Sequence, residues 1–334
     1  MLNAKIAFRA LRTRFVNHRP FILSHLLTSR CNADCQTCLW KVPATAAADE
    51  LTTDQIVELY RTAAGAGFCL LVLWGGEPLL RKDCGQLLRA AREAGLKTTL
   101  ITNGWWLEEQ AEELMPWTDR LMVSIDAVGQ KHDTIRRCPG LFERLDRGMQ
   151  QVRRAYPKVF VIANVVLSRL NSDALEEIAE YSKEHANLLS FQGMNETDYG
   201  HAFRELDLAK VRLSPEEEDQ IAERIAAMRR GGHRLSDSGA YLSRLGTVEG
   251  GYRCHFKKVS VRIEPNGDVL DCTKTAVPLA NVRQTSLPEI INSPDYDDFV
   301  KRAESCNRCR DFAVVEVSNL WEGRGLWSAI KTLT

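Results

Sequence analysis

Short apolar runs rich in β-branched residues alternate along the chain with segments in which apolar positions recur at helical spacing. The apolar runs cover residues 21–27, 69–74, 97–101, 121–125, 159–167 and 188–191. The helical segments between them cover residues 52–64, 86–94, 108–114, 141–155 and 174–185. Strands that alternate with helices pair in parallel, because each helix carries the chain back to the starting edge of the sheet. The pattern therefore predicts an α/β domain with a parallel sheet.

Six predicted strands are too few to close a TIM barrel, so we expect a partial (β/α)6 TIM-like barrel. Thr52 and Gln55 form a capping-box sequence at the start of the first of these helices, and Gly65 follows its end. After about residue 200 the alternation stops. A helix that Ser214 caps at its start and Gly231 ends leads into the last part of the chain.

The last part of the chain predicts a small module. Apolar runs at 259–263 and 269–272 flank Pro265-Asn266-Gly267-Asp268, a turn sequence typical of a β-hairpin. A helix is expected from Leu287 to about Glu304. The expected division is a basic N-terminal helix (1–20), a partial barrel (21–200), a helical connector (201–250), a β-hairpin and helix module (251–315) and a C-terminal tail (316–334).

The composition narrows the class of protein. The 334 residues carry 44 basic and 44 acidic side chains, a balance that argues against a dedicated nucleic-acid-binding protein. No apolar run reaches the roughly 20 residues of a membrane-spanning helix. The N-terminus lacks the pattern of a signal peptide, so we expect a cytoplasmic protein.

The positive charge is concentrated at the N-terminus, where residues 1–33 contain six basic side chains and no acidic one. At helical spacing Phe8, Leu11 and Phe15 share one face of the predicted helix, and the basic side chains lie on another. The favoured interpretation is a helix that packs its apolar face on the main domain and leaves its basic face in solvent. The alternative is a peripheral membrane contact, in which the helix rests on an anionic lipid surface.

Ten cysteines are many for a cytoplasmic protein, in which disulfides are rare. Cys31, Cys35 and Cys38 lie together in the loop after the first predicted strand. A structural zinc ion is tetrahedral, and no nearby Cys or His supplies a fourth ligand. A 4Fe–4S cluster takes one ligand per iron, so three cysteines would leave one iron open to another molecule.

A second motif follows the next predicted strand. Gly75-Gly76-Glu77-Pro78 comes directly after the apolar run at 69–74. Together with Cys31-x3-Cys35-x2-Cys38 it resembles the radical S-adenosylmethionine (SAM) superfamily, over residues 21–200. The resemblance implies that SAM binds the open iron through its amino and carboxylate groups. Reductive cleavage of SAM would then give a 5′-deoxyadenosyl radical that removes a hydrogen atom from the substrate.

The resemblance also implies a set of SAM-binding residues at the ends of the strands. Glu77 would accept the SAM ammonium, and Arg136 would pair with the SAM carboxylate. Gly75 and Gly76 would let the backbone approach the cofactor closely. Further cofactor-binding residues are Pro78, Asn103, Ser124, Asp126 and Asn164.

Four more cysteines are grouped toward the C-terminus. Their spacing resembles the twitch domain, a shortened form of the SPASM domain, and no cysteine follows Cys309 to complete a second auxiliary cluster. The resemblance implies one auxiliary 4Fe–4S cluster for electron transfer, with every iron ligated by Cys254, Cys272, Cys306 and Cys309. A four-cysteine zinc site remains the alternative.

The expected function is that of a radical SAM enzyme, either an oxidoreductase or a radical transferase. Its substrate would be a small molecule or a lipid, its reaction an oxidation or the formation of a C–C or C–S bond, and its reductant a flavodoxin or ferredoxin. Asp198 or Tyr199, after the sixth predicted strand, would be the substrate-facing acid or base. A radical SAM peptide maturase and a non-catalytic zinc-binding scaffold remain as alternatives.

Overall fold

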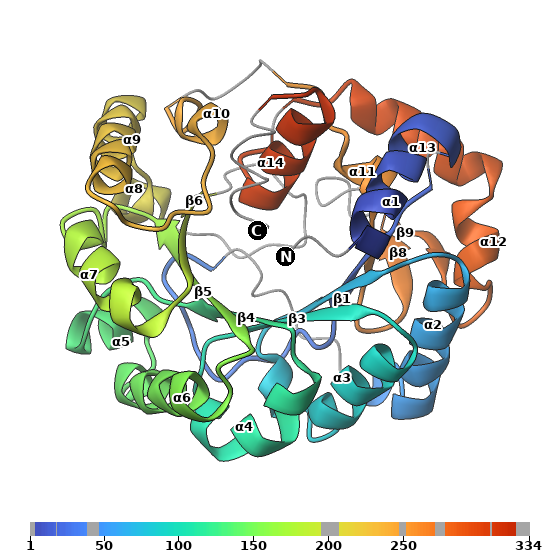
Figure 1. The fold of residues 1–334 in the computed structure, drawn as a ribbon, viewed down its shortest axis with the longest axis horizontal. Coiled ribbons are helices and arrows are strands. Elements are labelled where there is room, and N and C mark those ends of the chain that lie inside the picture. The colour runs from blue at the N-terminus through green and yellow to red at the C-terminus, as the bar shows by residue number, and fades with distance from the viewer. Residues whose placement is uncertain are drawn as a thin grey trace.

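The computed structural model describes residues 4–17, 19–38, 47–194, 207–246, 252–270, 278–307 and 309–324. Within these residues, nine strands form one sheet in the order β6-β5-β4-β3-β2-β1-β7-β8-β9. The first six are parallel to their neighbours and curve around a common axis (Figure 1). They are β1 Ile22–Leu26, β2 Leu70–Trp74, β3 Lys97–Thr102, β4 Arg120–Ser124, β5 Phe160–Leu167 and β6 Leu188–Gly193. This open, curved sheet confirms the predicted partial (β/α)6 barrel.

Helices cover the outer face of the barrel sheet (Figure 1). Leu71, Leu100 and Val123 on neighbouring strands are fully buried in the core that these helices share with the sheet. Burial of apolar surface contributes about 25 cal/mol per Å², so this layer is the main source of the barrel's stability. The covering helices are α2 Thr53–Gly65, α3 Cys84–Glu93, α4 Leu107–Leu114, α5 Gln130–Arg136, α6 Leu141–Ala155 and α7 Leu175–His185, with 3₁₀ turns at Ala47–Asp49, Pro78–Leu80 and Met115–Trp117.

The C-terminal hairpin extends the barrel sheet. β7 Ser260–Ile263 pairs in parallel with β1, and β8 Asp268–Leu270 and β9 Pro278–Asn281 follow in antiparallel order. The predicted hairpin strands are therefore present. Their position beside β1 was not predicted, because that pairing joins residues at opposite ends of the chain.

Helices from the second half of the chain complete the ring around the barrel (Figure 1). Among them α14 lies between α10 and α11, across the gap in the barrel. Its residues include the beginning of the segment that was expected to be a C-terminal tail. The single helix expected over 287–304 is divided, because Ser293 caps a new helix by accepting a hydrogen bond from the Tyr296 backbone N–H at 3.2 Å. These helices are α8 Leu208–Val211, α9 Pro215–Arg230, α10 Gly239–Leu242, α11 Phe256–Val259, α12 Leu287–Ile291, α13 Pro294–Glu304 and α14 Phe312–Trp321.

The N-terminal helix packs in the opposite orientation to the favoured prediction. α1 Ala4–Arg12 continues into a π-helical turn, η1 Thr13–Asn17. Phe8 and Phe15 point into solvent, whereas the Arg9 guanidinium packs against Gly67 of the barrel. The expectation of a buried apolar face was therefore wrong. No helix in the described part of the chain combines the length and the apolar character needed to cross a membrane.

Candidate functional site

The loop that follows β1 brings three cysteines together. Its backbone is held against the end of α5: the Asp34 N–H donates to the Arg136 carbonyl at 3.2 Å, and the Gln36 N–H donates to the Ile135 carbonyl at 2.9 Å. Burial raises the pKa of the Cys31 thiol to about 11, and the neighbouring Cys38 adds to this rise. Cys31, Cys35 and Cys38 therefore share one small region, in which Cys31 is exposed and the other two cysteines are half-buried; we call it the cysteine loop.

A buried ion pair lies beside the cysteine loop. Arg136 is 8% exposed, and its Nη2 lies 2.8 Å from Oδ2 of Asp126. Asp126 is also fixed through Oδ1, which accepts the Val166 N–H at 3.1 Å. The structure thus pairs two residues that were each expected to bind SAM. The Nε of Arg136 is buried and has no hydrogen-bond partner among the described residues, so one donor of this guanidinium remains for another acceptor.

The two glycines after β2 lie so close to another part of the backbone that a side chain would not fit there. The Gly76 N–H donates to the Thr28 carbonyl at 2.7 Å, and the Glu77 N–H donates to the Arg30 carbonyl at 2.8 Å. A Cβ at Gly75 would overlap the Thr28 carbonyl, and one at Gly76 would overlap the Arg30 carbonyl. These glycines therefore let the tetrapeptide lie directly against the segment that leads into Cys31, a close approach within the chain that the sequence did not reveal.

Glu77 is fully buried where β2 and β3 end. Its Oε1 accepts from the Thr102 hydroxyl at 2.7 Å and from the Leu79 N–H at 3.0 Å, and its Oε2 accepts from the Asn103 N–H at 2.7 Å. Burial raises its pKa to about 7, although these hydrogen bonds oppose the rise. A carboxylate has about four acceptor positions, so one remains for a cationic group. Pro78 begins the 3₁₀ turn that Glu77 caps.

Polar side chains also meet on the inner face of the barrel. Ser124, Asn164 and Ser190 are paired in register on β4, β5 and β6, so all lie on the same face of the sheet. The Ser190 hydroxyl is buried without a hydrogen-bond partner among the described residues. Asn103 lies closer to the cysteine loop, where its Nδ2 donates to Oδ1 of Asn32 at 2.8 Å. Ser190 was missed because only the register of the sheet places it beside Asn164.

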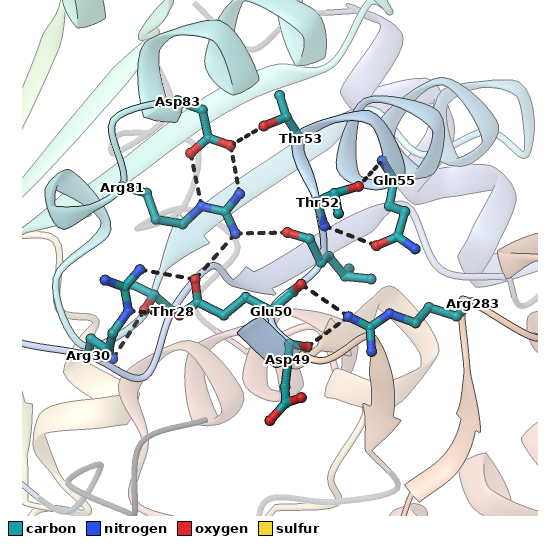
Figure 2. A network of polar contacts seen from close by, with 11 residues as sticks. Thr28, Arg30, Asp49, Glu50, Thr52, Thr53, Gln55, Arg81, Asp83 and Arg283 are labelled. Atoms are coloured by element: carbon teal, nitrogen blue, oxygen red, sulfur yellow. Dashed lines mark hydrogen bonds and ion pairs between the residues drawn. The ribbon is translucent and has the colours of Figure 1, made fainter. Parts of the chain in front are cut away.

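A buried carboxylate fixes the start of the cysteine loop (Figure 2). Oε1 of Glu50 accepts from the Thr28 hydroxyl at 2.5 Å and from Nε of Arg30 at 3.1 Å, while Oε2 accepts from Nη2 of Arg30 at 3.1 Å. Arg81 adds a cationic group 3.6 Å from Oε2. The side chains of three different segments therefore hold the backbone immediately before Cys31, and no sequence motif marked Glu50 for this position.

The same network connects the cysteine loop to the C-terminal module (Figure 2). Nη2 of Arg283, which follows β9, donates to the carbonyl of Asp49 at 2.7 Å and to that of Glu50 at 3.1 Å. Arg81 is in turn held by Asp83, with Nη2 and Oδ2 2.6 Å apart. The hairpin module is therefore fastened to the residues that position the cysteine loop.

Three cysteines of the second group also lie together. The Cys254 N–H donates to the Cys306 carbonyl at 3.1 Å, and the Tyr252 hydroxyl donates to the Cys309 carbonyl at 2.8 Å. Burial raises the pKa of Tyr252, and Cys309, Cys254 and Cys306 raise it further. Cys272 lies outside the described residues. Among the described residues, no three Cys, His, Asp or Glu side chains have the arrangement of ligands to a single metal ion.

Asp198 and Tyr199, the predicted substrate-facing residues, lie outside the described residues. Cys138, which belongs to neither cysteine group, lies beside the cysteine loop, where its Sγ accepts from Nδ2 of Asn32 at 3.7 Å and its side chain packs near Ala33. It is 5% exposed, so it closes one side of the loop.

Family models match both parts of the chain. The model of the radical SAM superfamily matches residues 26–182, and that of the SPASM iron–sulfur cluster-binding domain matches residues 254–310. The chain is 35% identical over 173 residues to the AdoMet-dependent heme synthase of Methanosarcina barkeri. This match covers 51% of the chain and 49% of the relative, so the chain aligns with about half of that curated protein.

Solved structures share the fold at low sequence identity. The structure of Streptococcus suis SuiB bound to S-adenosylmethionine is similar at a TM-score of 0.67 and 17% identity, over 87% of this chain and 70% of that one. The structure of anSMEcpe with bound AdoMet is similar at a TM-score of 0.66 and 17% identity, over 94% of this chain and 98% of that one.

The chain therefore carries a radical SAM domain, over residues 26–182, and a SPASM iron–sulfur cluster-binding domain, over residues 254–310. These two domains make 4Fe–4S clusters and SAM its cofactors. The residues present fit these groups. The cysteine loop supplies three thiols. The Nε of Arg136 beside them, which has no hydrogen-bond partner among the described residues, suits a carboxylate.

Proposed function

We propose that the enzyme cleaves SAM reductively and abstracts a hydrogen atom from a small-molecule or lipid substrate in the cytoplasm. When bound, the cluster and SAM supply the 5′-deoxyadenosyl radical that makes this abstraction feasible. The observation that carries the proposal is the Nε of buried Arg136, which lies beside the thiols of the cysteine loop and has no hydrogen-bond partner in the part of the chain that the structure describes. A fixed guanidinium at this point would orient a carboxylate ligand next to the cluster.

The chain's own residues would hold and orient the cofactors. Cys31, Cys35 and Cys38 would ligate the first cluster, and Glu77 would use its remaining acceptor position for the SAM ammonium. Ser124 and Asn164, side by side on the inner face, would donate hydrogen bonds to the rest of SAM, and the adjacent Ser190 extends this row toward the substrate.

The second cysteine group would hold the auxiliary cluster. Cys254, Cys306 and Cys309 supply three of its ligands, and we propose Cys272 as the fourth. A fully ligated cluster has no open iron, so it would transfer electrons and leave substrate binding to the barrel. A flavodoxin or ferredoxin would reduce the enzyme. The matched spans 26–182 and 254–310 support the division into a barrel (21–200), a connector (201–250) and an auxiliary-cluster module (251–315).

The substrate class is the open part of the proposal. The relative at 35% identity is named a heme synthase, a name that denotes the synthesis of a small molecule. This supports a small-molecule oxidation, or C–C or C–S bond formation, over the alternative of a peptide maturase. SuiB has been solved bound to its precursor peptide SuiA, but its 17% identity to this chain extends the likeness only to the fold.

Anaerobic reconstitution tests the proposal. The reconstituted protein should hold about eight irons, four in each cluster, and release 5′-deoxyadenosine when SAM and dithionite are added. Cys35→Ala should abolish this product, and Cys306→Ala should remove about four irons while some SAM cleavage remains. A colourless protein with about two zinc ions and no 5′-deoxyadenosine would instead establish the zinc-binding scaffold.

A further inference from the structure

The exposed large apolar side chains of the described residues are concentrated in one place. Phe8, Leu11, Phe15 and Val16 are 63%, 58%, 69% and 71% exposed, and all belong to α1 and η1. We call these four residues the N-terminal apolar face. Exposed apolar residues scattered singly over a surface need no explanation, but a contiguous group on one helix marks a site of interaction.

The structure fixes this face outward. On the opposite side of the helix Ala10 packs against the apolar cluster of Phe21 and Cys69. Thr13 is buried, and its hydroxyl donates to the Arg19 carbonyl at 2.7 Å. Turning the apolar face inward would break these contacts, so the helix is held with that face toward solvent.

Arg19 anchors the end of this segment to α13. Its Nη1 donates to the Ile291 carbonyl at 2.6 Å and lies 2.7 Å from Oδ1 of Asp297. Arg9, on the inner side of the helix, packs against Gly67, so Arg9 and Arg19 both contact the body of the protein. Polar contacts of Thr13 and Arg19 therefore hold the apolar face outward.

The positive charge around the apolar face favours an anionic partner. Arg12, which the sequence pattern placed on a different face, is exposed and lies one helical turn from both Phe8 and Val16, so it borders the apolar face. The Arg14 guanidinium lies 5.3 Å from the centre of the Phe15 ring, so a second positive charge borders the face. A twofold dimer through this surface would bring like charges together, because each copy presents the same residues. An anionic lipid surface instead takes up both the apolar and the positive side chains.

We propose that the N-terminal apolar face docks the protein on the surface of an anionic lipid bilayer. Phe21 and Cys69, on which the helix rests, directly precede β1 and β2. The docking face therefore lies at the end of the barrel opposite the cysteine loop, which follows β1. Docking would hold the enzyme at the membrane and leave the SAM-binding end accessible.

Vesicle sedimentation of the reconstituted holoprotein tests the proposal. The protein should sediment with vesicles that mix phosphatidylglycerol and phosphatidylcholine, and remain in solution with vesicles of phosphatidylcholine alone. A basic residue near an anionic surface contributes about 1 kcal/mol, so Arg12→Gln should weaken binding about fivefold. Arg61→Gln, on the exposed surface of α2, is the matched control and should bind as the unaltered protein does.

The double variant Phe8→Ser, Phe15→Ser should no longer sediment with the anionic vesicles. Both side chains are exposed, so iron content and 5′-deoxyadenosine formation should stay unchanged and show that the variant is folded. Equal binding of this variant, or binding that does not distinguish the two vesicle compositions, would overturn the proposal. Dimerisation of the unaltered protein in sedimentation velocity, lost in the double variant, would assign the face to a second copy instead.

Discussion

The two cysteine groups differ in how the chain brings them together. Cys31, Cys35 and Cys38 come from one loop, whose backbone is bonded to α5 on one side and to the tetrapeptide after β2 on the other. In the second group Cys254 precedes β7, whereas Cys306 and Cys309 lie between α13 and α14. The first group is a local structure held from several directions, and the second exists only when distant segments pack together.

The two cysteine groups are therefore held by different sets of contacts. The cysteine loop depends on short contacts with Gly76, Arg136 and Glu50 of the barrel. The C-terminal module reaches this network through the hydrogen bonds from Arg283 to the Asp49 and Glu50 carbonyls. The second group depends on the packing of α14, where the Ser318 hydroxyl accepts the N–H of His255, the residue after Cys254, at 3.0 Å. Local changes at the barrel contacts should therefore impair the first site while the second persists, and changes near α14 should do the reverse.

Gly76→Ala should give the largest effect. Its Cβ would overlap the Arg30 carbonyl, and backbone cannot move aside as a flexible side chain can. We expect loss of about four irons, one cluster, and loss of 5′-deoxyadenosine formation. The measurements are iron content and the electron paramagnetic resonance spectrum of the reduced protein, in which the auxiliary cluster should remain.

Gly239→Ala is the matched control, since nothing lies within 4 Å of the Cβ it would add. This variant should retain both clusters. If Gly76→Ala retained the first cluster, or if it lost both, the two sites would not differ in the way described.

Arg136→Lys should have the next largest effect. Lysine keeps a positive charge near Asp126 but lacks the planar fork that leaves Nε for a second carboxylate. A hydrogen bond to a charged group contributes about 1.5–3 kcal/mol, so the KM for SAM should rise about tenfold or more. The neighbouring Arg137→Lys, on an exposed side chain, should leave the KM unchanged. A lower kcat at constant KM would remove Arg136 from SAM binding.

Local signals explain which elements could be predicted from the sequence. The strands alternate strictly with helices, and α2 and α9 begin at capping boxes that Thr52 and Ser214 form within a few residues. α14 escaped prediction because its sequence FAVVEVSNLW is rich in β-branched residues, and its helical form depends on packing across the barrel gap. The outward apolar face of α1 was missed for a similar reason, since periodicity shows that two faces differ but not which one is buried.

The residues of the candidate site could be predicted where they belong to a local motif and not where tertiary structure alone brings them together. Motif residues such as Cys31 and Glu77 lie where strands end, as expected of a parallel barrel. Glu50 and Ser190 belong to no motif, and only tertiary structure brings Glu50 to Arg30 and Ser190 to Asn164. Spacing along the chain cannot identify such residues.

Glu50→Gln should have a moderate effect on the first site alone. The amide keeps one acceptor oxygen but removes the charge that Arg30 and Arg81 neutralise. Loss of charge-assisted hydrogen bonds costs about 1.5–3 kcal/mol, so the cysteine loop should open more often. Iron release to a chelator should become several-fold faster for the first cluster and stay unchanged for the second. Glu58→Gln, on the surface of α2, should release iron as the unaltered protein does.

Asp237→Asn should have the smallest effect, a change in how stability depends on pH. Asp237 lies next to α14, which packs beside the second cysteine group. Both side-chain oxygens of Asp237 lie 3.1 Å from the backbone nitrogen of Phe191 in β6, the edge strand of the sheet. The next residue, Ser238, donates its N–H to Glu316 of α14 at 2.6 Å. Burial raises the pKa of Asp237 to about 8 in the folded protein, whereas an unfolded aspartate titrates near about 3.9.

Between these pH values the folded chain binds the proton and the unfolded chain does not, so the free energy of unfolding falls as pH rises. Asp237→Asn cannot ionise and should remove this dependence. Its urea midpoint should match that of the unaltered protein at pH 5 and exceed it at pH 8. Equal midpoints at both pH values would show that Asp237 is already ionised in the folded state. The auxiliary cluster should also be released before the first cluster as pH rises, because the Ser238 N–H, next to Asp237, binds Glu316 of α14.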